Sequence, residues 1–198
     1  MSEHEQGLLI VISGPSGVGK TTIVHMIREE FNAIFSVSAT TRPKSKSEID
    51  GRDYYFISDE EFEERVRSDD FLEHAEVFGC HKYGTLRTPV MDALGKGEIM
   101  LLDIDVQGGV QVSNNMPESL RIFILPPNEQ ELLKRLESRA RDDVDSIQRR
   151  FREAKREIKF AKESGAYQFF ITNDDLEYAV SETLAIIQQT RNNTATTS

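Results

Sequence analysis

The sequence predicts an α/β fold in which a parallel sheet is flanked by helices. Apolar runs of strand length alternate with helical patterns along most of the 198 residues, and no segment repeats. A glycine-rich turn, Gly14 to Thr21, joins the first apolar run to the first helical pattern. Short aromatic runs between residues 38 and 87 interrupt the alternation. We expect this segment to form a small β-rich lobe inserted into one core domain.

The first elements lie on either side of the glycine-rich turn. Leu8–Ser13 is an apolar run typical of a buried strand, and Lys20–Phe31 has the apolar spacing of a helix. Phe35–Ala39 is predicted as a second strand. In the inserted lobe, β-like runs cover residues 54–57, 71–78 and 82–83. Ser58 and Glu61 fit a capping box, which predicts that a helix begins there.

The core pattern resumes after residue 98. Ile99–Asp103 and Leu120–Leu125 are nearly continuous apolar strands, and Phe169–Thr172 is predicted as the last one. Three helices are expected, one capped by Asn128 with Glu131 in the reciprocal position, one near residues 146–163, and one that begins at residue 174 or 175. The polar end of the chain, residues 191–198, is expected to be disordered.

The glycine-rich turn matches a known phosphate-binding pattern. Gly14-Pro15-Ser16-Gly17-Val18-Gly19-Lys20-Thr21 fits G-x-x-x-x-G-K-[ST], and a strand before it and a helix after it are the context this pattern requires. Backbone N–H groups at the start of the helix then surround an anion. Lys20 can reach the β- and γ-phosphates of a nucleotide, and the Thr21 hydroxyl can ligate Mg²⁺. A glycine turn that binds nothing is the alternative, and the flanking elements argue against it.

Two acidic residues follow the strand at residues 99–103. In folds with such a loop, a carboxylate at the end of a core strand helps to hold Mg²⁺, which makes Asp103 the candidate. Asp105 comes two residues later. Its position fits a cap on the next helix as well as it fits a contact to a ligand.

Cationic residues could serve phosphate chemistry elsewhere in the chain. Arg135 and Arg139 share one helix face, and Arg150 lies on the following helix. Guanidinium groups neutralise phosphate oxygens well, but on spacing alone a solvated face with salt bridges is the favoured interpretation. Arg42 and Tyr54 give a weak signal for a second phosphate site.

Composition limits the classes of function. The chain carries 24 basic and 34 acidic residues, a net charge of −10, which argues against a nucleic acid polymer as the main partner. Cys80 is the only cysteine, so no intramolecular disulfide can form, as suits a reducing cytoplasm. The apolar run after residue 6 is too short for a signal sequence or a membrane span. We therefore expect a cytoplasmic protein with no membrane partner.

Taken together, the motifs closely resemble the guanylate kinase family from about residue 7 to residue 188. The resemblance rests on Gly14–Thr22, Ser36–Arg42, Gly51–Tyr54, Glu73–Gly79, Tyr83–Thr85, Asp103–Gly108, Ile124–Pro127 and Asn173–Leu176. Their order is far more specific than the phosphate-binding loop, which many NTPases share.

The resemblance implies a nucleoside monophosphate kinase that uses ATP and Mg²⁺ to convert GMP to GDP. It implies a P-loop NTPase-type core (residues 7–37, 88–127 and 153–190), a GMP-binding lobe (38–87) and a helical lid (128–152). Guanine contacts would come from Ser38, Glu73, Thr85 and Asp105, and GMP phosphate contacts from Arg42, Tyr54 and Tyr83. Arg135, Arg139 and Arg150 would be lid and catalytic arginines, Thr22 would extend the ATP loop, and Asn173 would lie near the adenine. With this resemblance, the arginines are interpreted as phosphate ligands rather than as a solvated face. Asp105 is interpreted as a guanine contact rather than as a helix cap alone.

Some positions depart from the family pattern. A second phosphate-binding arginine is usual three residues after Arg42, where this chain has Ser45 between Lys44 and Lys46. His74 and Ala140 replace a common tryptophan and a usual glycine, and the segment 80–82 is one residue longer than usual. Two alternatives remain open: a non-catalytic module of the same fold that binds phosphopeptides, and a related small-molecule kinase such as one acting on ribose bisphosphate.

Overall fold

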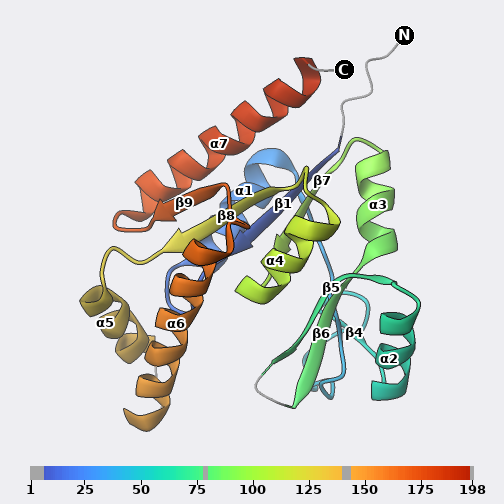
Figure 1. Cartoon of the computed structure of the whole chain (residues 1–198), viewed down its shortest axis with the longest axis horizontal. Coiled ribbons are helices and arrows are strands. Elements are labelled where there is room, and N and C mark those ends of the chain that lie inside the picture. Colours follow the sequence, from blue (N-terminus) through green and yellow to red (C-terminus); the bar gives the residue numbers. More distant parts are fainter. Residues whose placement is uncertain (1–6, 78–79, 140–143, 197–198) are drawn as a thin grey trace.

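The structure, a computed structural model, describes residues 7–77, 80–139 and 144–196. Two sheets organise this part of the chain, one with five strands and one with four. Figure 1 shows the larger sheet crossing the middle of the molecule between helices, with the smaller sheet projecting from one end. The α/β prediction with a parallel core sheet is confirmed.

The core sheet is parallel throughout, in the order β2-β7-β1-β8-β9. Its strands are β1 (Leu8–Ser13), β2 (Ile34–Phe35), β7 (Ile99–Asp103), β8 (Leu120–Leu125) and β9 (Phe169–Thr172). Ile12 of β1 is in register with Asp103 of β7, so the ends of both strands lie at the same edge. In open parallel sheets, ligands bind at this carboxyl edge.

Helices cover both faces of the core sheet, which explains why its central strands are apolar without alternation. One face packs against α1 (Lys20–Phe31) and α7 (Leu176–Thr196), and the other against α3 (Arg87–Gly95) and α4 (Val106–Asn115). Alternate residues of β1 point to opposite faces of the sheet. Ile10 packs with the residues of α1 and α7, and Val11 packs with those of α3 and α4, each with no exposed surface.

The second sheet has its own small core. Its strands are β3 (Ala39–Thr40), β4 (Tyr55–Phe56), β5 (Phe71–Val77) and β6 (His81–Leu86), in the order β4-β3-β6-β5, and α2 (Asp59–Arg67) packs beside them. Ala39, Phe62 and Phe71 are buried together there. Ser58 Oγ accepts a hydrogen bond from Glu61 N–H at 3.1 Å, as the capping pattern predicted.

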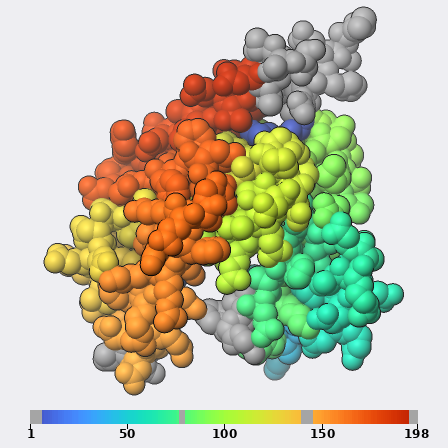
Figure 2. All heavy atoms as spheres, in the orientation of Figure 1, coloured from blue at the N-terminus to red at the C-terminus, as the bar shows by residue number. Residues whose placement is uncertain are grey.

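An arm of two helices extends from the core beside the second sheet. It consists of α5 (Glu129–Arg139) and the first half of α6 (Val144–Ser164). Asn128 Oδ1 accepts from Glu131 N–H at 2.8 Å, which confirms the predicted cap. α6 continues through residue 152 without a break, so the expected boundary between the lid and the core falls inside a helix. Figure 2 shows the arm and the second sheet projecting from the same end of the molecule.

Two predictions about local structure were wrong. Phe35–Ala39 is not one strand, because the chain leaves the core sheet at Ser36, whose N–H donates to Leu101 O, and joins the second sheet at Ala39. The expected disorder of residues 191–198 is contradicted as far as Thr196, where α7 ends; residues 197–198 lie outside the described part. Polar side chains support the last turns of α7, since Thr190 Oγ1 donates to Ile186 O at 2.9 Å.

The two longest helices, α6 and α7, each have 21 residues, and α6 carries charged side chains along most of its length. Among the helices of residues 7–77, 80–139 and 144–196, none combines the length and the apolar composition that a membrane span requires.

Candidate active site

The phosphate-binding loop joins β1 to α1 at the carboxyl edge of the core sheet. Gly19 caps α1 in the left-handed conformation, with φ 93°. A Cβ at this position would lie 2.5 Å from Asn173 Nδ2, so only glycine fits. Because the cap has no side chain, it leaves the N–H groups of the first turn to an anion.

Three contacts hold the loop in shape. The Lys20 ammonium donates to Gly14 O across the loop. Asn173, which is buried, donates from Nδ2 to Val18 O at 2.7 Å. Leu136 of the arm is buried against Gly17, since a Cβ added to Gly17 would lie 3.3 Å from the leucine side chain. Asn173, expected from the resemblance near the adenine, therefore also braces the loop, a role that the sequence did not indicate.

Asp103 lies at the end of β7, next to the loop. Burial raises the pKa of its carboxyl, and the positive charge of Lys20 opposes this rise. The Thr21 hydroxyl is on an exposed residue of the first turn of α1. Among the described residues, no group of three His, Cys, Asp or Glu side chains could hold a metal. One carboxylate and one hydroxyl fit a magnesium ion that takes its remaining ligands from phosphates and water.

Asp105 is the N-cap of α4. Its Oδ1 accepts from Gly108 N–H at 2.8 Å, which confirms the capping interpretation. The residue is also exposed, so its other carboxylate oxygen remains available to a ligand.

Glu73 is a buried carboxyl on β5, only 6% exposed. Its Oε1 accepts from both Thr85 N–H at 3.0 Å and Thr85 Oγ1 at 2.6 Å. Its Oε2 lies against Gly108, where an added Cβ would be 2.6 Å away. Burial raises the pKa of Glu73 to about 7; the Thr85 hydrogen bonds oppose the rise and the charge of Asp105 adds to it. The predicted residues Glu73, Thr85 and Asp105 are thus neighbours.

The predicted phosphate ligands of the lobe also come together. The Arg42 guanidinium lies 5.4 Å from the centre of the Tyr54 ring, and the Tyr54 and Tyr83 rings meet edge to face at 5.8 Å. Burial is the main cause of the raised pKa of Tyr54. Ser38, the remaining predicted lobe residue, is half-buried, and its carbonyl accepts from Tyr55 N–H at 2.9 Å.

Two of the three predicted lid arginines can be placed. Arg150 Nη2 donates to Ser16 Oγ at 2.6 Å, so α6 brings it directly onto the phosphate loop. Arg135 faces Glu131 at 3.6 Å, the kind of salt bridge that its spacing alone favoured. Arg139 is the last residue of α5, and its side chain is outside the described part of the chain, as is Ala140.

Sequence reasoning missed three residues around this site. Glu48 holds Arg42, Gly108 makes room for Glu73, and Glu157 of α6 is a partly buried acid whose pKa the charge of Lys20 lowers against the effect of burial. Each acts on a partner at least six positions away. The one local signal was a glycine pair, Gly108-Gly109, inside a helical pattern, where glycine needs a packing reason.

A family model described as guanylate kinase matches residues 6–190. The guanylate kinase of Clostridium tetani is 44% identical over 183 residues, which are 92% of this chain and 86% of that protein. The guanylate kinase of Thermus thermophilus is 45% identical over 186 residues, 94% of this chain and 83% of that one.

A solved structure agrees with these sequence matches. The crystal structure of guanylate kinase from Anaplasma phagocytophilum superposes with a TM-score of 0.72 at 33% identity, covering 94% of this chain and 87% of that one. Sequence and fold lead to one conclusion: the chain belongs to the guanylate kinase family.

Proposed function

We propose that this protein is a guanylate kinase that transfers the γ-phosphoryl group of ATP to GMP, giving ADP and GDP. The observation that carries this proposal is the environment of Glu73. A buried carboxyl with one oxygen fixed by Thr85 and the other turned toward Gly108 fits a base that presents adjacent N–H donors. A complete phosphate-binding loop in the same chain supplies the donor site.

The acceptor base is selected by hydrogen-bond chemistry. Guanine presents N1–H and N2–H₂ on one edge, and a carboxylate at Glu73 can accept both. Asp105 can take a further donor with the oxygen that does not cap α4, and Ser38 and Thr85 complete the contacts. Adenine presents a bare N1 at the same place, which would face the Glu73 oxygens without a proton between them. A buried polar group left unpaired in this way is a strong source of discrimination.

The acceptor phosphate would bind where Arg42, Tyr54 and Tyr83 meet. A guanidinium forms two parallel hydrogen bonds to a phosphate, and each phenol adds one donor. Holding both ends of GMP on the second sheet fixes the direction in which its phosphate points. Such positioning is a main source of catalysis when the reacting groups are otherwise stable.

The donor triphosphate would lie along residues Gly14–Thr22, with the N–H groups of the loop around its β-phosphate and Lys20 between its β- and γ-phosphates. Thr21 and Asp103 would hold a magnesium ion, which neutralises charge on the phosphates when bound. Asn173 would lie near the adenine while bracing the loop.

The arm supplies the remaining positive charge. Arg150 already contacts the phosphate loop, and Arg135 and Arg139 are carried on the neighbouring helix. We propose that residues 128–152 act as a lid that brings these arginines to the transferring phosphoryl group and excludes water, so that the group reaches GMP rather than being hydrolysed. Residues 38–87 then form the GMP-binding lobe and the rest of the chain the core. We place the reaction in the cytoplasm, where the free, exposed Cys80 thiol stays reduced.

A coupled assay of ADP release tests this proposal. Purified protein with ATP and Mg²⁺ should release ADP rapidly with GMP, more slowly with dGMP, and negligibly with AMP or ribose phosphates. Lys20→Ala is the control: it should melt normally and lose a factor of roughly 10²–10⁴ in kcat, as expected when one preorganised charge is removed. No GMP-dependent release would favour the phosphopeptide-binding module, and release with ribose phosphates alone would favour the small-molecule kinase.

A further inference from the structure

The outer edge of β5 is covered by side chains of α4. β5 is the last strand of its sheet and pairs with β6 on one side. On the other side, Gln111 Oε1 accepts from His74 N–H at 3.1 Å, and Gln111 Nε2 donates to His74 O at 2.7 Å. One amide side chain therefore makes both hydrogen bonds that a residue of a neighbouring strand would make.

A second amide of α4 holds β5 two residues earlier. Asn115 Nδ2 donates to Leu72 O at 2.7 Å. Leu72 belongs to the second sheet, yet its side chain has no exposed surface and lies in the same core cluster as Val112 of α4. Glu73, the carboxyl assigned to guanine, therefore lies between two residues whose backbones α4 holds.

One face of α4 makes all of these contacts. Gly108, Gln111 and Asn115 are three and four positions apart, so they form a row along the helix. Gly108 is the residue that leaves room for Glu73 Oε2, since an added Cβ would lie 2.6 Å from that oxygen. The row therefore contacts both the carboxyl of Glu73 and the backbone on either side of it.

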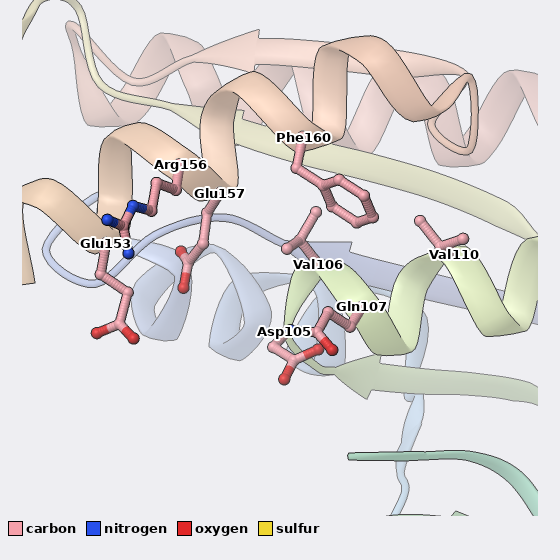
Figure 3. A pocket seen from close by; sticks show the side chains of 8 residues that line it. All are labelled: Asp105, Val106, Gln107, Val110, Glu153, Arg156, Glu157 and Phe160. Atoms are coloured by element: carbon pink, nitrogen blue, oxygen red, sulfur yellow. The ribbon is translucent and has the colours of Figure 1, made fainter. Parts of the chain in front are cut away.

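The opposite face of α4 packs on the core. Figure 3 shows Val106 and Val110 pointing toward α6, where Phe160 lies. Val106 is buried in one cluster with Ala161 of α6. Asp105 is the N-cap of the same helix. α4 thus carries one predicted guanine ligand at its beginning and supports the strand that carries the other.

We propose that Gln111, supported by Asn115, is a positioning residue for guanine recognition: its amide fixes β5 against α4 and so sets the place of the Glu73 carboxylate relative to Asp105. Gln111 acts through Glu73 and is not itself a ligand of the base, because His74 engages both ends of its amide. This inference rests on the proposed function, because it requires that Glu73 binds guanine.

The two guanine ligands need such a support because they belong to different parts of the fold. Thr85 fixes the Glu73 carboxyl within the second sheet, whereas Asp105 follows β7 of the core sheet. Their spacing is kept only while the second sheet stays docked on α4. Hydrogen bonds form over a narrow range of about 2.7–3.2 Å, so a shift of roughly 1 Å between the two carboxylates would weaken the contacts to one base.

The test compares steady-state kinetics of the wild type and Gln111→Met. Methionine is close to glutamine in length and helix propensity but makes neither hydrogen bond, so α4 itself should be preserved. We expect the KM for GMP to rise about tenfold, on the scale of one weakened hydrogen bond to a charged group. The kcat at saturating GMP and the KM for ATP should not change, since only binding of the acceptor is affected. The ratio of kcat/KM for GMP to that for AMP should fall by the same factor.

A double-mutant cycle separates positioning from a general loss of structure. When Glu73→Gln is already present, Gln111→Met should lower kcat/KM for GMP by less than about threefold, because the group that Gln111 positions has been altered. A purely structural role predicts the same loss with and without Glu73→Gln.

Hydrogen exchange provides a readout that does not depend on activity. The His74 amide should exchange several-fold faster in Gln111→Met than in the wild type, because its hydrogen bond to the side chain is gone. Asn114→Ala is the matched control for both measurements. It removes an amide from an exposed position one turn further along α4 and should match the wild type.

Each outcome supports or overturns the inference. A Gln111→Met variant with the wild-type KM for GMP, or with the wild-type exchange rate at His74, overturns it and leaves the proposed function intact. Equal losses with and without Glu73→Gln overturn it as well. A wild type without GMP-dependent ADP release refutes the proposed function, and the role of Gln111 with it. If Gln111→Met does not fold, Asn115→Ala decides, because it removes the hydrogen bond to Leu72 O on the other side of Glu73. An unchanged GMP-to-AMP ratio in Asn115→Ala would then contradict the proposal.

Discussion

Arg42 and Glu48 form a two-point ion pair, with Nη1 to Oε2 at 3.1 Å and Nη2 to Oε1 at 2.6 Å. Glu48 also accepts from Ser45 N–H at 2.8 Å. Arg42, with the Ser45 N–H, lowers the pKa of Glu48 to about 2, and Glu48 raises the pKa of Arg42. The carboxylate thus occupies the guanidinium edge that a phosphate would use, so GMP must share Arg42 with Glu48 or displace it.

The first prediction concerns the missing arginine. Because Glu48 compensates the charge of Arg42, a second guanidinium at position 45 should strengthen the phosphate site. Ser45→Arg should lower the KM for GMP by about tenfold, equivalent to about 1.4 kcal/mol, with little change in the KM for ATP. Steady-state kinetics at low and high salt would measure this. Ser47→Arg adds the same charge to the same exposed loop and should have a smaller, salt-sensitive effect. Equal effects at the two positions would show that the added charge attracts GMP only by non-specific electrostatics.

The second prediction concerns Gly108. A Cβ there would lie 2.6 Å from Glu73 Oε2, so Gly108→Ala must push away the oxygen assigned to guanine. We expect the KM for GMP to rise by roughly tenfold or more while the KM for ATP stays the same, since one good hydrogen bond to a charged group is weakened. Gly95→Ala is the control, because a Cβ at the end of α3 meets nothing within 4 Å. An unchanged GMP affinity in Gly108→Ala would show that Glu73 does not hold the base.

The third prediction concerns stability and pH. The pKa of Glu73 is raised from 4.5 to about 7 in the folded protein, so between these values the folded state holds more protons than the unfolded state. The contribution of Glu73 to stability is therefore fully present below pH 4.5 and is lost as the pH rises to 7. The loss is on the order of 3 kcal/mol.

Replacing Glu73 by Gln removes this titration. Urea unfolding of wild type and Glu73→Gln between pH 4.5 and pH 8 should give a difference in the free energy of unfolding that shifts in favour of the variant as the pH rises, then levels off. A difference that is constant over this range would mean that Glu73 ionises normally in the folded state.

The fourth prediction concerns the arm. Arg135 is paired with Glu131 here and would have to exchange that partner for phosphate oxygens when both nucleotides are bound. Hydrogen exchange in residues 128–139 and 144–152 should therefore slow when a bisubstrate analogue, adenosine and guanosine joined by five phosphates, is added. α7, which packs against α1 in the core, should change little. Unchanged protection of the arm, with binding confirmed by calorimetry, would support a rigid solvated face.

Features that depend on neighbouring residues in the sequence could be predicted. The phosphate loop, its flanking strand and helix, and the caps at Ser58 and Asn128 each follow from residues within a few positions of one another. The parallel core follows from strands that are apolar on both faces. The prediction of one strand at Phe35–Ala39 was wrong because an apolar run predicts only that the chain is extended. The division of this segment between two sheets is decided by the distant partners Leu101 and Gly84.

The residues of the candidate site also differ in whether local sequence or distant contacts determine their place. Glu73 and Thr85 could be named only through the resemblance to a family, and Asp105 by itself fitted a helix cap as well as a ligand contact, because the proximity of the three depends on the docking of β5 against α4. Glu157 is one of several acids on a charged helix, and nothing local separates it from Glu153. Only the packing of α6 in the fold shows that Glu157 is partly buried and Glu153 is exposed.

The most direct test of the central claim, that a phosphate-binding loop serves a guanine-specific acceptor site, is the ratio of kcat/KM for GMP to that for AMP. We expect a ratio of roughly 10⁴ or more in the wild type, as for sites that select by buried hydrogen bonds. In Glu73→Gln the ratio should fall by at least about tenfold, because an amide can no longer accept both guanine donors as a charged group. Equal kcat/KM values for the two nucleotides in the wild type would contradict the account.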